Sequence, residues 1–170
     1  MNEGEYILEL RHISKTFSGV VALKNVDMGV RNGEVHALLG ENGAGKSTLI
    51  KILSGYHQPD KGGEMLIAGR PVTFRNPKDA IEASIHTIYQ ELTLCPHMTV
   101  AENIVLDKQN HFKGFLQRRH EYQAIAAGAL EDLGQSEINP DWLVKDLSIA
   151  QQQVVEIAKA VTSKAKIVLM

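Results

Sequence analysis

The chain has 170 residues, of which 44% are hydrophobic and 22% charged, so it is long enough to bury a core as one compact domain or a two-lobed one. Its formal net charge of −2 gives no electrostatic footprint for nucleic acid. The N-terminus lacks a signal-peptide apolar run, and no stretch approaches the ~18 apolar residues of a membrane span. We therefore expect any membrane role to come through a partner.

The cysteine and the basic residues give little further indication of function. The single cysteine, Cys95, excludes an intrachain disulfide and favours a reducing, cytosolic compartment. It lies in an apolar stretch without a neighbouring metal pattern, so we interpret it as a small core residue. The short basic run at residues 118–120 is followed by Glu121 and is interpreted as the solvated start of a helix.

The N-terminal part of the chain is predicted to form strands. Residues 6–13 alternate in the manner of a half-buried strand. Residues 14–19 are predicted to form a turn that carries Phe17, and residues 20–30 resume the strand pattern. Because the links are short, these strands should pair antiparallel.

The next segment has the order strand, glycine loop, helix. After a tight turn at residues 31–33, the apolar run 34–39 predicts a buried strand. Residues 40–48 fit G-x-x-x-x-G-K-[ST], the phosphate-binding loop. Residues 47–54 have apolar positions at helical spacing, and Gly55 is placed to end that helix.

This context favours a nucleoside triphosphate site. Glycines let the backbone curl so that N–H groups point at an anion, and the positive end of the following helix faces the same point. Lys46 adds a charge near the β- and γ-phosphates, and the Ser47 hydroxyl is placed to bind Mg²⁺. A glycine-rich turn capping an ordinary helix is the alternative; a dinucleotide loop would need G-x-G-x-x-G, which is not matched. The predicted phosphate-binding residues are Gly40, Glu41, Asn42, Gly43, Ala44, Gly45, Lys46, Ser47 and Thr48.

The following residues predict a second hairpin and then a helix and a strand. Residues 64–68 and 71–74 should pair around a turn at residues 69–70. A short helix is predicted over residues 77–83 and a strand over residues 85–89.

The pattern then becomes helical. Thr99 and Glu102 have capping-box spacing and should start a helix that runs through Leu106. Apolar residues at spacings of three and four predict an amphipathic helix over residues 122–133, ended by Gly134.

A second capping box precedes the end of the chain. Ser148 and Gln151 have the required spacing and should open a helix through about Thr162. Residues 166–170 are a buried strand by composition.

Four features in order resemble the nucleotide-binding subunits of ABC transporters. They are the aromatic turn at Phe17, the loop 40–48, a strand that ends at Gln90, and the segment 147–151. The amino-acid sequence of these segments looks most like that of the bacterial sugar importers of the ribose, xylose and galactoside group. The resemblance covers nearly the whole chain and implies an α/β fold, a P-loop NTPase core with an antiparallel β lobe and an inserted α-helical lobe.

The resemblance also implies a division into lobes. Residues 1–92 and 163–170 would form the P-loop NTPase core with its antiparallel β lobe. Residues 93–162 would form the helical lobe, which ends in the signature helix.

ATP and Mg²⁺ are the cofactors that the resemblance implies. Phe17 would stack on adenine, although it could instead be a core aromatic. Gln90 would contact Mg²⁺ and water and relay to the membrane partner, although it could be a solvated strand end. Ser148, with Gln151, would face the γ-phosphate bound on an opposing nucleotide domain, and it can cap its helix at the same time.

By the same resemblance, the intact protein would be the ATP-binding subunit of an importer that couples ATP hydrolysis to sugar uptake. It would lie peripherally on the cytoplasmic face of the inner membrane. Its partners would be transmembrane permease subunits, a second nucleotide-binding domain and, indirectly, a substrate-binding protein; no nucleic acid is expected. The alternatives are a soluble ABC ATPase acting on nucleic acid or ribosomes, or a non-hydrolysing nucleotide-binding fragment.

Two departures from the family pattern matter. Ile149 and Ala150 stand where the usual signature has two glycines, and their Cβ atoms could weaken its contribution. In the family, the strand that resembles residues 167–170 is followed by an Asp for Mg²⁺ and a Glu that activates water. The chain contains neither, so we expect it to be the front part of a nucleotide-binding domain that binds without turnover, and we assign no catalytic residue.

Overall fold

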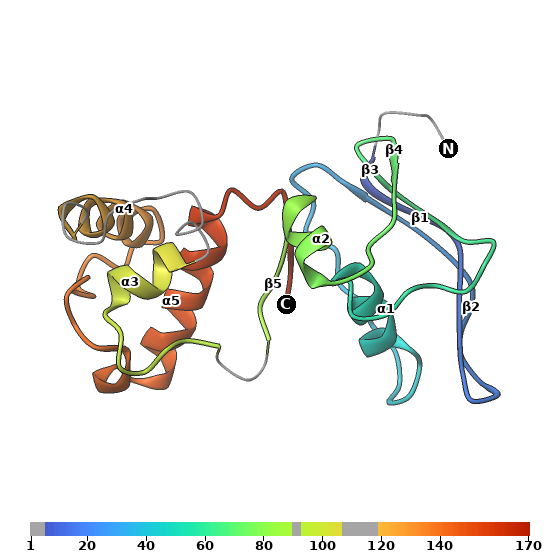
Figure 1. The fold of residues 1–170 in the computed structure, drawn as a ribbon, viewed down its shortest axis with the longest axis horizontal. Helices are drawn as coiled ribbons and strands as arrows, with labels where there is room; N and C mark the ends of the chain where they lie inside the picture. The colour runs from blue at the N-terminus through green and yellow to red at the C-terminus, as the bar shows by residue number, and fades with distance from the viewer. Residues whose placement is uncertain (1–5, 90–92, 107–118) are drawn as a thin grey trace. The chain divides into compact units, whose positions relative to one another are not determined.

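The computed structural model describes residues 6–89, 93–106 and 119–170. The chain divides into two compact units, Met1–Ile85 and His86–Met170 (Figure 1). In the described part of the chain, no helix is both long enough and apolar enough to cross a bilayer.

Unit 1 contains one four-stranded antiparallel sheet, as the short links predicted. The strand order is β2-β1-β3-β4, so the N-terminal strand lies inside the sheet rather than at its edge. The strands are β1 (Tyr6–Phe17), β2 (Val20–Arg31), β3 (Glu64–Ile67) and β4 (Arg70–Val72).

The β1–β2 hairpin is longer than the sequence indicated. The predicted turn over residues 14–19 is wrong, because β1 continues through Phe17, which pairs with Val20. Only Ser18 and Gly19 form the turn, with φ values of 43° and 88°. Positive φ at both central residues is the requirement of a type I′ turn, whose twist matches that of the strands it joins.

The second hairpin has the same kind of connection. Ala68 and Gly69 have φ values of 47° and 75°, and the flanking Ile67 and Arg70 are paired. The turn therefore lies one residue earlier than predicted, and β4 begins at Arg70. Alanine rarely adopts a positive φ, so the sequence gives no indication that Ala68 belongs to the turn.

Two helices follow the predicted ranges in unit 1. α1 (Lys46–Leu53) buries Leu49, Ile52 and Leu53, and Gly55, at φ 77°, follows its end as predicted. α2 (Pro77–Glu82) begins after Asn76, whose side chain accepts hydrogen bonds from two amides of the first turn.

Unit 2 contains the predicted helices and a short two-stranded pairing (Figure 1). Both capping boxes are present, at Thr99 with Glu102 and at Ser148 with Gln151. The strands are shorter than predicted. From the boundary between the units, which falls within β5, the elements are β5 (Ile85–Thr87), α3 (Val100–Val105), α4 (Arg119–Asp132), η2 (Val144–Asp146), α5 (Ile149–Thr162) and β6 (Ile167–Leu169).

Helices α3, α4 and α5 enclose the core of this unit. The buried residues are apolar, and those of α4 belong to the apolar face that the helical spacing over residues 122–133 predicted. They include Val100, Ile104, Val105, Tyr122, Ala126, Leu130, Ile138, Val144, Val155 and Ala158.

Two buried polar side chains fix the irregular segment before α3. Asn103, 1% exposed, accepts a hydrogen bond from the amide of Cys95 at 2.7 Å and donates to the carbonyls of Cys95 and Thr99. Glu156 of α5 accepts from the amide and the hydroxyl of Thr93 at 2.7 and 2.8 Å. Cys95 itself is only half-buried, so its prediction as a core residue is wrong; Asn103 occupies the interior beside it.

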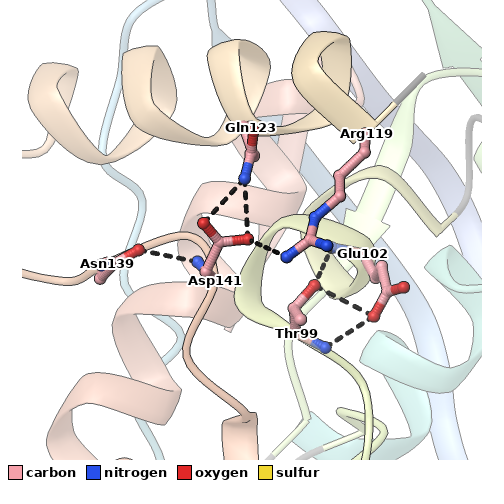
Figure 2. Close-up of polar contacts among 6 residues, drawn as sticks. All are labelled: Thr99, Glu102, Arg119, Gln123, Asn139 and Asp141. Carbon is pink, nitrogen blue, oxygen red and sulfur yellow. Dashed lines mark hydrogen bonds and ion pairs between the residues drawn. The ribbon is translucent and has the colours of Figure 1, made fainter. Parts of the chain in front are cut away.

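A carboxylate joins α4 to the loop that follows it (Figure 2). Asp141 accepts hydrogen bonds from Arg119 at 3.0 Å and from Gln123 at 2.7 Å, while its own amide donates to Asn139. The hydrogen bonds from Arg119 and then from Gln123 hold the pKa of Asp141 below its ordinary value. Arg119 is exposed at the start of α4, as the interpretation of a solvated helix start implied, and it is also paired with Asp141.

This cluster predicts an acid-sensitive contribution to the stability of unit 2. Because the folded-state pKa of Asp141 is lowered, its stabilisation is present above the unfolded pKa of about 3.9 and is lost as pH falls through the folded value. Asp141→Asn should lower the urea midpoint at pH 7 and leave a smaller difference between pH 7 and pH 3. The fluorescence of Trp142, the single tryptophan, reports the transition.

The control is Asp132→Asn, which removes an exposed carboxylate from the last turn of α4. It should keep the wild-type dependence of the urea midpoint on pH. An equal loss of pH dependence in both variants would contradict the role given to Asp141.

Candidate functional site

The phosphate loop has the curled backbone that glycine permits. Gly43 and Gly45 both have φ of 86°, in the region that L side chains avoid. The amide of Ala44 donates to the carbonyl of Glu41 at 3.2 Å and closes a turn between them. The loop therefore doubles back before α1 begins.

Gly45 fixes the position of the loop against the sheet. It precedes α1 as a left-handed cap residue and is buried. A Cβ atom built on it would lie 2.5 Å from the carbonyl oxygen of Ala22 and 2.7 Å from Leu23 Cδ2. No side chain longer than hydrogen fits there, so the loop lies directly on β2.

Lys46 places its charge inside the loop. Its Nζ donates to the carbonyl oxygens of Gly40 at 2.6 Å and Glu41 at 2.7 Å. The ammonium thus lies across the start of the loop, while its own Cα belongs to the first turn of α1. Because these contacts are solvent-exposed, an anion can reach the same ammonium group.

The first turn of α1 adds donors beside that charge. The first amides of a helix have no intrahelical acceptor, and no hydrogen bond of the described residues uses the amides of Gly45, Lys46 or Ser47. The first turn carries no acidic residue, so nothing offsets the positive end of the helix dipole. Ser47 is exposed and Thr48 half-buried on this turn. This donor set suits a phosphate chain, and the Ser47 hydroxyl suits Mg²⁺.

The prediction of a buried strand over residues 34–39 is wrong. The segment is irregular, and Val35 and Leu39 are 96% and 91% exposed. A continuous apolar run becomes a strand only when neighbouring strands cover it, and within the described residues no strand pairs with this segment.

The turn that leads into this segment is braced by polar contacts. Glu34 accepts hydrogen bonds from the amide of Arg31 and contacts the His36 ring nitrogen, both at 2.9 Å. These contacts, with His36 the larger cause, hold the pKa of Glu34 below its ordinary value. The predicted turn at residues 31–33 is present.

Phe17 lies near the same end of the β1–β2 hairpin as the loop. It pairs with Val20 beside the turn, whereas Gly45 contacts β2 at Ala22 and Leu23, a few residues away. Phe17 is 38% exposed, and the centroid of its ring lies 5.0 Å from that of His57. The sequence did not predict the roles of Ala22, Leu23 and His57. These residues contact predicted site residues, and no sequence motif indicates such contacts.

The remaining predicted site residues are Ser148 and Gln151, which belong to unit 2, and Gln90. Ser148 caps α5 in unit 2, and its amide and hydroxyl both donate to Gln151 Oε1 at 3.0 Å. Ile149 is 71% exposed and Ala150 is also exposed, so this helix start faces solvent. Gln90 lies outside the described residues.

Comparisons with known proteins agree on the kind of protein. The ABC transporter family matches residues 23–170. The ribose import ATP-binding protein RbsA 2 of Burkholderia pseudomallei (strain 1710b) is 51% identical over 96% of this chain. A putative ribose/galactose/methyl galactoside import ATP-binding protein of Pseudomonas fluorescens is 48% identical over 97%. The chain spans about a third of the length of these curated relatives, 32% of each.

Solved structures show the same fold. The ATP-binding cassette MJ1267 of an ABC transporter matches with a TM-score of 0.81 and 28% identity, over 96% of this chain and 67% of that one. The protein cbiO1 of Clostridium perfringens, part of the ABC transporter complex cbiONQ, matches with a TM-score of 0.80 and 27% identity, over 96% and 64%. The predicted α/β P-loop NTPase fold is therefore confirmed.

The contact of Gly45 with β2 predicts a difference between two glycines that have the same φ. Gly43→Ala and Gly45→Ala both place alanine at φ 86°, which costs roughly 1–2 kcal/mol. Only Gly45→Ala also drives a Cβ into β2, because nothing lies within 4 Å of a Cβ at Gly43. Overpacking of this kind costs about 1–3 kcal/mol more. Urea denaturation should show that difference, and equal losses of stability would contradict the packing described.

Proposed function

The chain belongs to the ABC transporter family, and from that premise we propose that it is the ATP-binding part of an importer that couples ATP hydrolysis to sugar uptake. The observation that carries the proposal is the glycine loop with the Lys46 ammonium held across it. The relatives named as ribose or galactoside import ATP-binding proteins support the choice of a sugar importer.

Residues 40–48 would hold the phosphates of ATP. The amides of the first turn of α1 and the Lys46 ammonium are donors of the kind that bind a polyphosphate. Ser47 and Gln90 are the proposed ligands of Mg²⁺, which when bound neutralises charge on the β- and γ-phosphates. Phosphoryl transfer depends mainly on positioning and electrostatic stabilisation, so a loop that packs directly on β2 suits the task.

Phe17 would hold the base. Its partly exposed ring lies at the end of the hairpin against which the loop is packed, and stacking of a base on an aromatic ring contributes about 1–3 kcal/mol.

Ser148, with Gln151, would meet the γ-phosphate bound on a second nucleotide-binding domain. The exposed start of α5 leaves its first amides accessible, although Ile149 and Ala150 carry Cβ atoms where the family has glycines. As part of the same proposal, residues 1–92 and 163–170 form the nucleotide core and residues 93–162 the helical lobe.

The proposed partners are transmembrane permease subunits, with a substrate-binding protein acting indirectly. The protein would then lie on the cytoplasmic face of the membrane, attached through the permease. Co-purification with a permease rather than with nucleic acid or ribosomes tests this assignment.

Removing the ammonium should weaken nucleotide binding. Hydrogen bonds to charged groups contribute about 1.5–3 kcal/mol, so Lys46→Ala should raise the dissociation constant for ATP at least tenfold. Titration calorimetry measures the constant, and circular dichroism checks the fold. Lys51→Ala, which removes an exposed lysine from the same helix, is the control and should bind as the wild type does. An unchanged constant for Lys46→Ala would rule out the assigned role.

We further expect residues 1–170 alone to bind ATP without turnover, because no acidic residue follows β6 in this sequence. Phosphate release by the purified chain should not exceed that of Lys46→Ala. Release that depends on Lys46 would refute this expectation.

A further inference from the structure

Phe17 has two neighbours that contact its ring, His57 from beyond α1 and Lys15 from its own strand. The centroid of its ring lies 5.0 Å from that of His57, with an angle of 65° between the ring planes. On β1 itself, the Lys15 ammonium lies 5.3 Å from the Phe17 centroid. An edge-on aromatic neighbour and a nearby cation both restrict the orientations that an exposed ring can take.

His57 is itself fixed to the end of α1. Its amide donates to the carbonyl oxygen of Lys51 at 3.0 Å, as does the amide of Tyr56 at 2.8 Å. These bonds follow the left-handed Gly55, where a Cβ would lie 2.5 Å from the carbonyl oxygen of Asn76. The backbone that carries the imidazole is therefore fixed by hydrogen bonds and close packing at the end of α1.

The chain after His57 is also tied to β1. The amide of Asp60 donates to the carbonyl oxygen of Ser14 at 2.8 Å, and the Asp60 carboxylate lies 3.6 Å from the Lys15 ammonium. The segment that carries His57 thus runs along the end of the strand that carries Phe17.

These contacts place residues proposed to act on the nucleotide near both ends of α1. Its first turn carries Lys46, and the segment that follows its C-cap, Ser54, carries the His57 ring that contacts Phe17. We infer that His57 is a positioning residue for the nucleotide base: it fixes the Phe17 ring in the orientation in which a base stacks on it. This inference rests on the proposed function and adds to it a residue that no motif assigns.

The test separates the base from the phosphates by using two probes, ATP and inorganic tripolyphosphate. In the purified chain, His57→Ala should raise the dissociation constant for ATP about 2- to 12-fold, the range expected for one aromatic pair. The constant for tripolyphosphate should stay within about twofold of wild type, because that probe has no base. Titration calorimetry gives both constants.

Two further variants distinguish positioning from a general loss of stability. His57→Phe keeps an aromatic edge against Phe17 and should restore ATP affinity to within about twofold of wild type. In the Phe17→Ala background, His57→Ala should have no further effect on ATP affinity, because the ring that it orients is absent. His12→Ala, which removes an exposed histidine from β1, is the control and should leave both constants unchanged.

Each other outcome overturns the inference. Equal weakening of ATP and tripolyphosphate would mean that His57 supports the loop rather than the base. Unchanged ATP affinity in His57→Ala, failure of His57→Phe to restore it, or additive losses with Phe17→Ala would each exclude the positioning role. Wild type that binds ATP no more tightly than tripolyphosphate would overturn this inference alone. Wild type that binds neither would overturn the proposed function and this inference with it.

Discussion

The candidate site depends on the absence of a side chain at Gly45. Because that residue has no Cβ, the loop can lie directly on β2, and α1 can begin within contact of the strand. The position of Lys46 follows from this contact, since its backbone begins α1 and its ammonium reaches back to the carbonyls of Gly40 and Glu41. One close approach between a loop and a strand thus determines where the donors and the positive charge of the site lie.

In unit 2, buried polar side chains hold a segment that has no regular secondary structure. Asn103 satisfies backbone groups of Cys95 and Thr99, and Glu156 satisfies the amide and hydroxyl of Thr93. Both side chains are almost completely buried, where an unsatisfied polar group is costly. The stretch between Thr93 and α3 is therefore held by specific hydrogen bonds rather than by a sheet or a helix.

Local chemistry explains which features could be predicted from sequence. The capping boxes, the glycine that ends each of two helices and the glycine loop depend on residues within a few positions of one another, and all are present. The predictions were wrong where the local structure depends on residues that are distant in the sequence. Residues 14–17 extend β1 only because β2 lies beside them, and the environment of Cys95 depends on Asn103. The contact of His57 with Phe17 joins residues 40 positions apart and has no local signal.

The exposed run that precedes the phosphate loop affects how the chain behaves in solution. An exposed segment with apolar side chains such as Val35 and Leu39, which pairs with no strand of the described residues, is a place where a strand of another molecule can add. Such an addition depends on protein concentration, so self-association should begin at this segment when the chain is concentrated. The tendency of the purified chain to aggregate is thus expected to originate a few residues from the place where the nucleotide is proposed to bind.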